Sequence, residues 1–519
     1  KTENILILVA FSIGLGSTWR FPYLCHQNGG GSFLLMYLIL LLLLGIPLMY
    51  MEMVIGQWLR VDNIRAWKHL VPWLSGVGYS SMLACALVIL YNSALVSWSL
   101  FYLGQSFDYP TPWENCPLVK NFSTSDISCL RTEPHQFFWY HTVLRASDQI
   151  EEGIEVLVLN VTLCLFATWF FLYITMVTRI KISVLMMIFS ILFPNVLLFC
   201  FFTHIFFVKG VRDSLKRLVT TELSILASLD AWRQAGGHVL YSLGLGMGTI
   251  ITFSSYQTRG ENYIKWASFV AMVNLMTSLL SSSVIFLMLG FWIENSGTPC
   301  VESRAAVVGG TTSTLLSPTF LLSKPLNATR FTTTQEMNVT QPRKANCHRF
   351  YLKLPCLVSY FSQFMEGPGL AYVAFSQAIT LFPGSSFWAI IFFMSLVIMG
   401  LGTMTTLVEG IALSLQKSIS TLEKHPKLVP VIICLGGFLG SLVFSSRPGS
   451  YVVFLFDDHL VPMVLIMIVA FQNLSLAWVY GIKRFRAEMF GQLGRLVWAP
   501  FTFLWSYVTL PTLLVLLTI

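Results

Sequence analysis

The sequence predicts an all-α membrane protein that crosses the bilayer many times. Of its 519 residues, 55% are hydrophobic and only 11% are charged, and the mean hydropathy is +0.70. A soluble domain carries about 25% charged residues, so this chain has too few charged residues to cover a water-facing surface. Its apolar residues are gathered in runs of about 20, the length that a helix needs to span the hydrocarbon layer. The lipid bilayer is therefore a partner, and a soluble protein, a disordered chain and a nucleic-acid-binding protein are excluded.

Eleven such runs follow one another, and each is predicted to be a transmembrane helix. In order they are Ile5–Leu24, Phe33–Met51, Leu70–Phe107, Val156–Thr178, Ile182–Val208, Gln234–Thr258, Trp266–Ile293, Gly367–Val408, Leu428–Ser446, Val461–Ile482 and Leu496–Ile519. The run from Gly367 is too long for one crossing, and Pro383-Gly384 divides it into a short amphipathic piece and a span near Trp388–Ser414. Eleven spans, of which residues 496–519 are the last, predict a twelfth beyond Ile519.

Positive charge predicts which loops face the cytosol. Lys and Arg gather in five alternate connections, at Arg60, Arg65 and Lys68, at Arg179 and Lys181, at Arg259 and Lys265, at Lys417, Lys424 and Lys427, and at Lys483, Arg484 and Arg486. Short loops rich in positive residues remain in the cytosol. The intervening loops are then exoplasmic, and they hold glycosylation sequons at Asn121, Asn327 and Asn338. The pattern leaves open whether the membrane is the plasma membrane or that of an intracellular vesicle.

Two of the predicted exoplasmic loops contain cysteines. Cys116 and Cys129 share the first, and in an oxidising lumen this pair predicts a disulfide. Cys300, Cys347 and Cys356 share the long loop at residues 293–383, and their pairing stays open.

Glycines interrupt two of the predicted helices. The first contains Gly14-Leu15-Gly16-Ser17 and the sixth contains Gly244-Leu245-Gly246-Met247-Gly248. Glycine tolerates unwound backbone, and such backbone survives at membrane depth only where it lines a cavity or is buried in protein. Interruptions at matching positions of two five-helix halves, residues 1–208 and 233–482, predict a single inverted-repeat transporter domain, 1–519, with its site at the breaks. The alternative is that these glycines only let helices approach closely.

Polar residues beside the breaks favour the binding interpretation. They are Ser12, Ser17 and Thr18 in the first helix and Ser242 and Thr249 in the sixth. A broken helix frees carbonyls that can coordinate a cation and amides that can hold an anion. This chemistry suits a zwitterion bound together with a hard ion.

Several motifs resemble those of the neurotransmitter:sodium symporter family. They are Phe11-Ser-Ile-Gly-Leu-Gly-Ser-Thr-Trp-Arg-Phe-Pro-Tyr23, Asn28-Gly-Gly-Gly-Ser-Phe33, Gly45-Ile-Pro-Leu-Met-Tyr-Met-Glu52, Gly367-Pro-Gly-Leu-Ala371 and Trp478-Val-Tyr-Gly481. The resemblance therefore covers nearly the whole chain. The long loop between the seventh and eighth helices is most similar to that of the amino-acid and orphan branch.

The resemblance implies a site for a small zwitterionic solute. Monoamine carriers of the family have an acidic residue where this chain has Gly14, and the glycine leaves room for the solute's own carboxylate, as in members that transport amino acids. The other implied substrate positions are Gly16, Tyr91, Gly244, Gly246 and Met247, with Tyr241 as an outer aromatic lid. The alternative for Tyr91 is an ordinary packed aromatic side chain.

The resemblance also implies two gates. A cation within the apolar layer costs about 3 kcal/mol or more, so Arg20 should have a partner. In the family this partner is an acid on the tenth helix, here Asp457 or Asp458; the alternative is an interfacial Arg20 that reaches water. At the cytosolic gate Tyr256 matches the family, but Lys417 stands where the family has an acid.

Sodium and chloride are the coupling ions of the family, and the positions implied for them are partly altered. The implied sodium positions are Ala10, Ser12, Ile13, Ser17, Ser242, Asn274, Met399, Gly402 and Thr403. The implied chloride positions are Tyr37, His238, Ser242, Asn274 and Ser278. Ser17 replaces an Asn, Gly402 replaces a side-chain ligand, and His238 replaces a Gln. Each lost oxygen ligand weakens sodium binding unless water replaces it.

The sequence is consistent with two candidate functions. The first is a secondary-active carrier that couples a neutral amino acid or similar zwitterion to sodium, and to chloride, through weakened sites. The second is a transport-impaired member of the family that acts as a membrane partner or sensor, with an accessory membrane protein. An enzyme is not expected, because the chain has neither a P-loop Gly-Lys nor a His-Glu-x-x-His zinc pattern, and no organic cofactor is implied.

Overall fold

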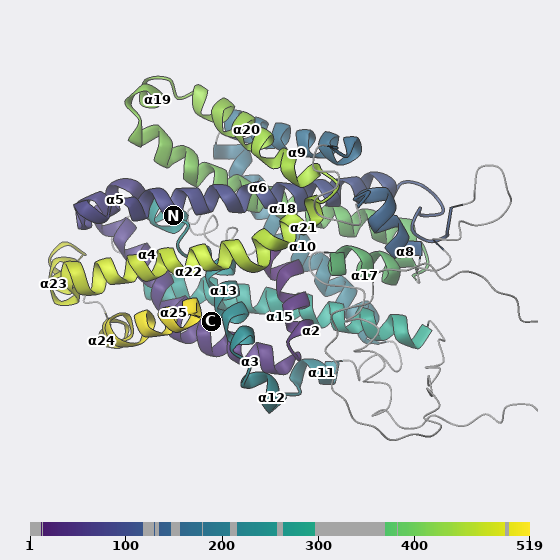
Figure 1. Ribbon diagram of the computed structural model, residues 1–519, viewed down its shortest axis with the longest axis horizontal. Coiled ribbons are helices and arrows are strands. Elements are labelled where there is room, and N and C mark those ends of the chain that lie inside the picture. Colours follow the sequence, from purple (N-terminus) through teal and green to yellow (C-terminus); the bar gives the residue numbers. More distant parts are fainter. Residues whose placement is uncertain are drawn as a thin grey trace, which may run out of the picture. The chain divides into compact units, whose positions relative to one another are not determined.

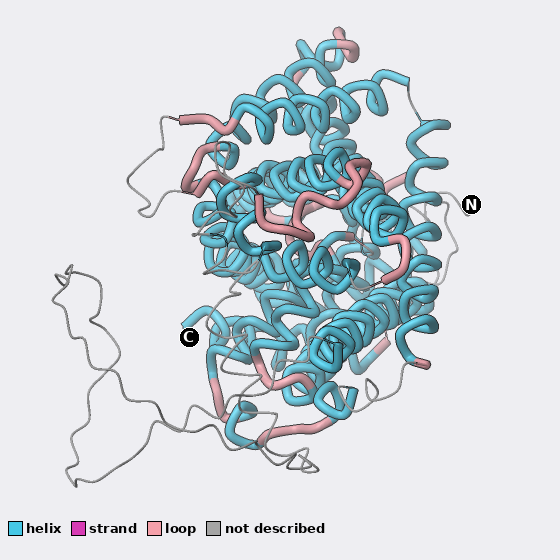
Figure 2. The backbone as a smooth tube through the Cα atoms, turned by 90° about the vertical axis from the view of Figure 1, so that its right-hand side faces the viewer, coloured by secondary structure: helices cyan, strands magenta, loops and turns pink. Residues whose placement is uncertain are grey.

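The described residues of the computed structural model are 12, 14–117, 129, 134–146, 156–178, 180–207, 215–256, 263–295, 369–380, 382–493 and 498–518. Within this part of the chain every regular element is a helix, and the only extended pairing is an isolated bridge between Leu157 and Ser446 (Figures 1 and 2). The prediction of an all-α protein is confirmed.

The helices follow the predicted order. The first half contains η1 Gly16–Arg20, α2 Phe21–Gln27, α3 Gly31–Leu40, η2 Leu41–Gly45, α4 Ile46–Leu59, α5 Asn63–Leu70, α6 Gly76–Gln105, α8 Pro134–Phe137, η4 Phe138–Val143, α9 Leu159–Thr178 and α10 Ile180–Phe206. The second half contains α11 Lys216–Val219, α12 Leu223–Leu226, α13 Leu229–Leu243, α14 Thr249–Ser254, α15 Tyr263–Asn295, α17 Gly369–Thr380, α18 Ser385–Ser418, α19 Ser420–Lys424 and α20 Leu428–Ser441. The last helices are η7 Leu442–Ser445, α21 Gly449–Leu455, η8 Phe456–Leu460, α22 Val461–Leu474, η9 Ser475–Gly481, α23 Ile482–Leu493, α24 Ala499–Phe503, η10 Leu504–Val508 and α25 Thr509–Thr518.

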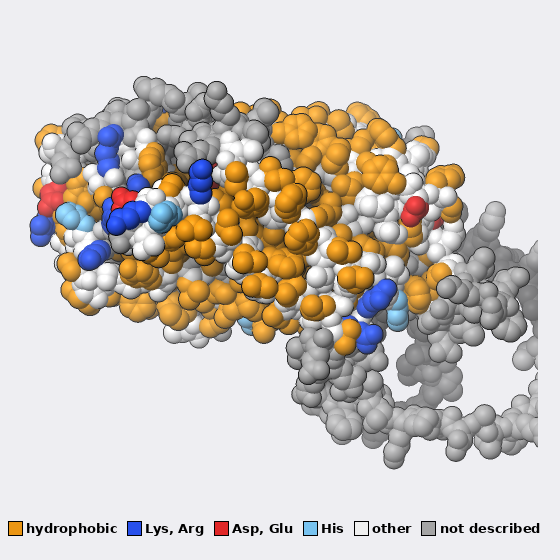
Figure 3. All heavy atoms as spheres, turned by 90° about the horizontal axis from the view of Figure 1, so that it is seen from above, with side chains coloured by type: hydrophobic (Ala, Val, Ile, Leu, Met, Phe, Trp, Pro, Cys, Tyr) orange, Lys and Arg blue, Asp and Glu red, His pale blue; other side chains and the backbone are white. Residues whose placement is uncertain are grey.

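Nine helices in the described residues are long and apolar enough to cross a membrane. Of the two expected spans that are absent from these nine, the sixth is interrupted by its glycines, and most of the first lies outside the described residues. Figure 3 shows hydrophobic side chains over the middle of one face, with Lys and Arg gathered toward its ends. Because lipid faces apolar side chains and water faces charged ones, this distribution fits a multi-pass membrane protein.

The sixth span is broken where the sequence predicts. α13 ends at Leu243 and α14 begins at Thr249. Between them Gly244, Gly246 and Gly248 adopt φ of 70°, 78° and 75°. Residues with a side chain pay about 1 kcal/mol or more in this left-handed region, so glycine at all three positions makes the unwound segment accessible.

The first span is irregular at the predicted point as well. Ser12 is helical and Gly14 forms a bend. Helical backbone resumes at Leu15 and continues through the π-helical turn η1 into α2. Pro22 lies in the first turn of α2, a position where the missing N–H of proline costs little. Ala10 and Ile13 lie outside the described residues.

The broken segments are held by long continuous helices. α6 packs along α18, α10 packs against both α18 and α15, and α15 contacts η1. α14 packs on α4, and α13 lies between α3 and α22 (Figure 1). Both breaks are therefore enclosed by helices that do not themselves unwind.

The tenth span begins earlier than the apolar run suggests. The sequence predicts Val461–Ile482, but the helical segments run from Gly449, through α21, η8 and α22. Asp457 and Asp458 interrupt the apolar pattern, although they lie inside the span. Asp457 is tolerated because a cation neutralises it, which a reading of apolar runs cannot detect.

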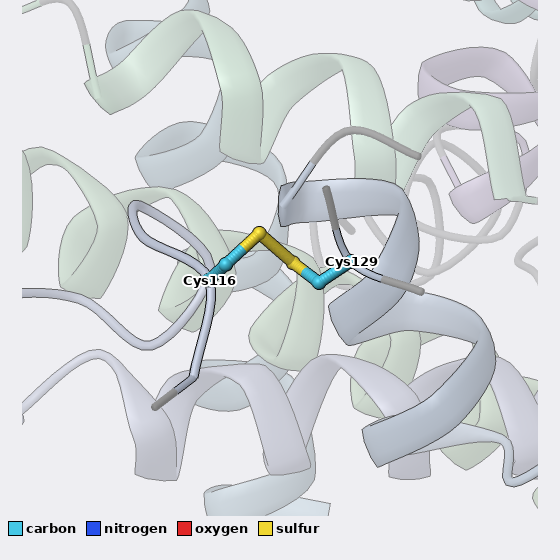
Figure 4. Close-up of a disulfide and its surroundings, with 2 residues drawn as sticks. All are labelled: Cys116 and Cys129. Atoms are coloured by element: carbon cyan, nitrogen blue, oxygen red, sulfur yellow. A yellow bond between two sulfur atoms is a disulfide. The ribbon is translucent and has the colours of Figure 1, made fainter. Parts of the chain in front are cut away.

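Two further predictions are confirmed. Cys116 and Cys129 form a disulfide, with Cα atoms 5.8 Å apart (Figure 4). The long run from Gly367 divides into α17 and α18 around Gly384, whose φ is 78°. The sequons at Asn121, Asn327 and Asn338 and the cysteines at 300, 347 and 356 lie outside the described residues, and the assignment of repeats stays a prediction.

Candidate functional site

A cavity lies between the two broken segments and the helices α6 and α18. The unfilled space there, including the part that is open to solvent, is about 300 Å³. Its lining residues are Ser12, Gly14, Gly16, Ser17, Val88, Asn92, Tyr241, Ser242, Met247, Thr403 and Leu407. Within this described lining every side chain is neutral, so a charged ligand would be held by backbone groups, hydroxyls and one carboxamide.

The glycines of the first span keep this space open. A Cβ atom added at Gly14 would lie 2.6 Å from Thr403 Oγ1, and one added at Gly16 would lie 2.6 Å from Tyr241 Cε1. Both contacts are closer than van der Waals packing permits, so side chains at these positions would displace the cavity wall. The structure thus explains both glycines by close approach rather than by flexibility alone.

Glu52 fixes the break of the sixth span to its surroundings. Its Oε1 accepts a hydrogen bond of 2.8 Å from the Gly246 backbone N–H, and its side chain is buried. A buried N–H without a partner would cost about 1–3 kcal/mol, so this bond stabilises the unwound segment. Met247 faces the cavity, whereas Gly244 and Gly246 form the turn and are not part of the lining.

The residue of α6 that faces the cavity is Asn92 and not Tyr91. Asn92 and Val88, one helical turn apart, both line the cavity. The Tyr91 hydroxyl instead donates to Asp457 Oδ1 at 3.2 Å. Adjacent residues of a helix point about 100° apart, so a difference of one position changes the face on which a side chain lies. The role of Tyr91 toward the solute, which the resemblance implies, stays a prediction.

Arg20 is bound by a network above the cavity. Arg20 Nε lies 2.9 Å from Asp457 Oδ2, and Nη2 donates to the Asp457 backbone oxygen at 2.8 Å. Tyr23 donates to the same Oδ2 at 3.0 Å. Both charged side chains are 1% exposed. Arg20 is therefore a buried, paired cation and not an interfacial one.

The neighbouring acid has a different partner. Asp458 Oδ2 lies 3.2 Å from His459 Nδ1, and the Asp458 backbone oxygen accepts from Arg233. Of the two candidate partners of Arg20, the structure therefore selects Asp457. Tyr241 closes the network from below, because its ring centroid lies 5.1 Å from the Arg20 guanidinium carbon.

The residues of the expected cytosolic gate lie just beyond the C-terminal end of α14. Lys417 Nζ lies 4.6 Å from the centre of the Tyr256 ring, and the Lys417 backbone oxygen accepts from Arg65. One turn deeper, the hydroxyls of Thr252 and Ser414 lie 3.5 Å apart. A cation on α18 therefore covers the aromatic ring directly, which sequence reasoning did not anticipate.

Asn274 joins three helices at the positions expected for the first sodium ion. Its Nδ2 donates to the backbone oxygens of Ser12 and Ser242, and its Oδ1 accepts from Tyr37 at 2.9 Å. Ser17 lies nearby in the lining, and its hydroxyl donates to the Gly14 oxygen at 2.9 Å. The expected residues converge, and the backbone oxygens of Ser12 and Ser242 both accept from the Asn274 amide nitrogen.

Of the positions expected for the second sodium ion, Met399, Gly402 and Thr403 lie on α18, and Ala10 and Ile13 lie outside the described residues. Thr403 Oγ1 donates to the Met399 oxygen at 3.1 Å. A Cβ atom added at Gly402 would lie 2.3 Å from Ser190 Oγ of α10. The space that a side chain of residue 402 would take is thus occupied by a hydroxyl from another helix.

The residues expected to hold chloride also converge. The rings of Tyr37 and His238 have centroids 5.6 Å apart, and the Tyr37 side chain interacts electrostatically with Ser242 and Ser278. His238 Nδ1 lies 3.4 Å from Arg20 Nη1, while its Nε2 is buried without a partner among the described residues. His238 therefore lies between this cluster and the Arg20 network.

Residues 1–519 match the sodium:neurotransmitter symporter family. The chain belongs to this family. It is 35% identical to the sodium-dependent neutral amino acid transporter B(0)AT2 of Bos taurus, over 100% of this chain and 71% of the relative. It is 36% identical to the human sodium-dependent neutral amino acid transporter SLC6A17, over 98% of this chain and 70% of that protein. It is 34% identical to the human orphan sodium- and chloride-dependent neurotransmitter transporter NTT5, over 99% of this chain and 70% of that protein.

Membership of the sodium:neurotransmitter symporter family settles the broad class. The chain is an integral multi-pass membrane protein with the helical transporter fold. The family and these relatives are transporters and not enzymes, and they support sodium-coupled symport of a small solute.

Proposed function

We propose that this protein is a secondary-active transporter that carries a neutral amino acid, or a similar small zwitterion, together with sodium and chloride. The observation that carries the proposal is the cavity between the two broken spans. Its position between the two broken spans and its neutral, partly polar lining suit a solute whose two charges cancel. The relatives named for neutral amino acids favour the same class.

The lining offers a different surface to each part of such a solute. Val88, Met247 and Leu407 supply an apolar wall that would receive an aliphatic side chain. Hydroxyl, carboxamide and backbone groups supply the rest. Because the described lining contains no acidic side chain, the solute's ammonium group would be bound by carbonyl oxygens at the breaks, which carry the negative end of the helix dipole.

Sodium coupling is proposed at both expected positions. The convergence of Ser12, Ser242 and Asn274 supports the first, because hard cations prefer several oxygen ligands at one point. At the second, the Ser190 hydroxyl occupies the space of a side chain at Gly402, the residue before Thr403. We therefore expect the loss of the usual ligand at Gly402 to weaken the site less than the sequence alone suggests.

Chloride is proposed at the cluster of Tyr37, His238, Ser242, Asn274 and Ser278. Hydroxyl and N–H donors around a buried anion form charge-assisted hydrogen bonds. His238 can donate from Nε2, the atom that has no protein partner in the described residues.

The test is uptake into proteoliposomes of a panel of neutral amino acids, with sodium replaced by choline and chloride replaced by gluconate. We expect saturable uptake of at least one amino acid that falls in choline and in gluconate. Uptake that does not change in choline would contradict sodium symport. The absence of both binding and uptake for the whole panel would favour the transport-impaired partner or sensor, the alternative that Ser17, Gly402 and Lys417 suggest.

A further inference from the structure

The connection between the fifth and sixth spans carries apolar side chains on its outer surface. It contains the short helices α11 and α12 and leads into α13, and we call residues 216–229 the strap. Figure 1 shows α11 and α12 at the margin of the helical bundle, beside α3. Val219, Leu223 and Leu229 of the strap are 77%, 82% and 61% exposed. Three aliphatic side chains exposed so fully in one short segment indicate a surface that another molecule covers.

The opposite surface of the strap is packed against the protein. The Glu222 backbone N–H donates to the Ser32 hydroxyl at 2.7 Å, and this hydroxyl lies 3.1 Å from the Glu222 oxygen. Leu218 is buried, and Ile225 lies so close to Gly29 that a Cβ atom added there would collide with it. The strap is therefore held in place on one side, and its exposed apolar side chains lie on the other.

The strap joins the two broken spans at the predicted exoplasmic side. Gly29 and Ser32, which it contacts, belong to the turn after α2 and to the first turn of α3. At its other end the Trp232 indole N–H of α13 donates to the Leu226 oxygen at 2.9 Å. A molecule bound to the outer surface of the strap would thus act at the ends of both spans that enclose the cavity.

The exposed surface of α3 shows what covers the strap. Leu35, Ile39 and Leu42 are exposed, and their spacing of four and three residues places them on one face of the helical segment. This segment belongs to a span, so the face lies against lipid. α11 and α12 contact α3, and the Thr220 backbone oxygen lies against Gly31 at its first residue. The apolar surface of the strap therefore continues the lipid-facing surface of α3.

We propose that the strap is a phospholipid-binding surface at the boundary between headgroups and acyl chains of the exoplasmic leaflet. Val219, Leu223 and Leu229 insert among the acyl chains. The exposed hydroxyl residues Thr221 and Ser224, which alternate with them, face the headgroups. Apolar and uncharged polar side chains side by side suit this boundary, because each kind meets a layer of its own polarity.

The first experiment measures how fast single introduced cysteines react with a charged methanethiosulfonate reagent. The protein is placed in phosphatidylcholine nanodiscs that hold one copy each, and also in phosphatidylcholine proteoliposomes. The test variants are Leu223→Cys and Val219→Cys. Glu222→Cys, the exposed neighbour, is the control for water, and Leu42→Cys on the lipid-facing surface is the control for lipid. Wild-type protein gives the background from native cysteines, and thermal unfolding shows which variants are folded.

We expect both test variants to react at least about tenfold more slowly than Glu222→Cys, because a thiol in apolar surroundings forms little of the reactive thiolate. Their rates should match that of Leu42→Cys in nanodiscs and in proteoliposomes alike. Rates equal to that of Glu222→Cys in both preparations would overturn the proposal, because the surface would then face water. Slow reaction in proteoliposomes combined with fast reaction in nanodiscs would overturn it in favour of a second copy of the chain.

A second experiment identifies lipid directly on the unmodified protein. Wild-type protein is reconstituted with a phosphatidylcholine that carries a photoreactive diazirine in its acyl chain, and the adducts are located by mass spectrometry. We expect adducts within residues 216–229 as well as on the exposed face of α3. Adducts on α3 without any on the strap would overturn the proposal. Neither experiment measures transport, so its outcome is independent of the proposed function.

Discussion

Asp457→Asn is the substitution that most directly probes the Arg20 network as an outer gate. The substitution keeps the shape of the side chain and removes its charge. Arg20 is 1% exposed, so in the closed arrangement it would be left as a buried cation without a counterion. Removing one member of a buried ion pair costs about 3–5 kcal/mol. Opening the gate would let water hydrate Arg20 and avoid this cost.

The expected result is therefore a shift toward the open arrangement. A cost of about 3–5 kcal/mol corresponds to about 100- to 4000-fold in the equilibrium between closed and open gates. The assay places a cysteine at Met247, which lines the cavity, and measures its reaction with a membrane-impermeant thiol reagent applied from outside. Asp457→Asn should accelerate this reaction strongly, and the same variants with Met247 retained report the background from native cysteines.

The matched control is Asp458→Asn, the adjacent acid, whose carboxylate pairs with His459 and lies outside the hydrogen-bonded pair of Arg20 and Asp457. It should leave the reaction rate within about twofold. The double variant Arg20→Met, Asp457→Asn should return the rate toward that of wild type, because it removes the uncompensated charge as well. Equal rates in Asp457→Asn and Asp458→Asn would refute the reasoning.

Three further substitutions test other parts of the site. Gly14→Ala should weaken binding of labelled amino acid by at least about tenfold, because its Cβ would lie 2.6 Å from Thr403 Oγ1 and intrude on the cavity. Lys417→Gln removes the cation over the partly exposed Tyr256 ring, a contact worth about 0.5–1 kcal/mol, so thiol labelling from the cytosolic side should rise about two- to fivefold. Ser190→Ala should raise the sodium concentration that gives half-maximal uptake by about threefold or more, if its hydroxyl replaces the ligand missing from the second sodium position.

Each of these three variants has a control with the same type of substitution at another helical position. Gly436→Ala adds a Cβ where no atom lies within 4 Å, and it should leave binding intact. Lys424→Gln removes a cation of α19, and Ser283→Ala removes a hydroxyl bonded to its own helix; neither should change its assay. If a control changes its assay as much as the matching test variant does, the explanation given for that test variant is refuted.

The sequence predicted those features that depend on local pattern. Apolar runs located the spans, and glycine clusters located both breaks, because the sixth span needs glycine for left-handed backbone and the first needs it for close approach. The disulfide followed from two cysteines in one loop. These signals are carried by neighbouring residues, so they can be read without tertiary structure.

Features that depend on side-chain direction or on distant partners could not be read in this way. Tyr91 and Asn92 are adjacent, and only their rotation about α6 decides which one faces the cavity. Asp457 and Asp458 are equivalent in sequence, and only the packing of η8 near Arg20 separates them. Ser190 and Gly402 are on α10 and α18, so nothing local connects the hydroxyl with the space that it fills.

The most direct test of sodium-coupled transport is accumulation of a neutral amino acid against its own gradient. Proteoliposomes loaded with potassium and diluted into sodium chloride should concentrate the labelled amino acid above its external level, and an ionophore that dissipates the sodium gradient should release it. An internal concentration that only reaches the external one, with or without the gradient, would contradict the account.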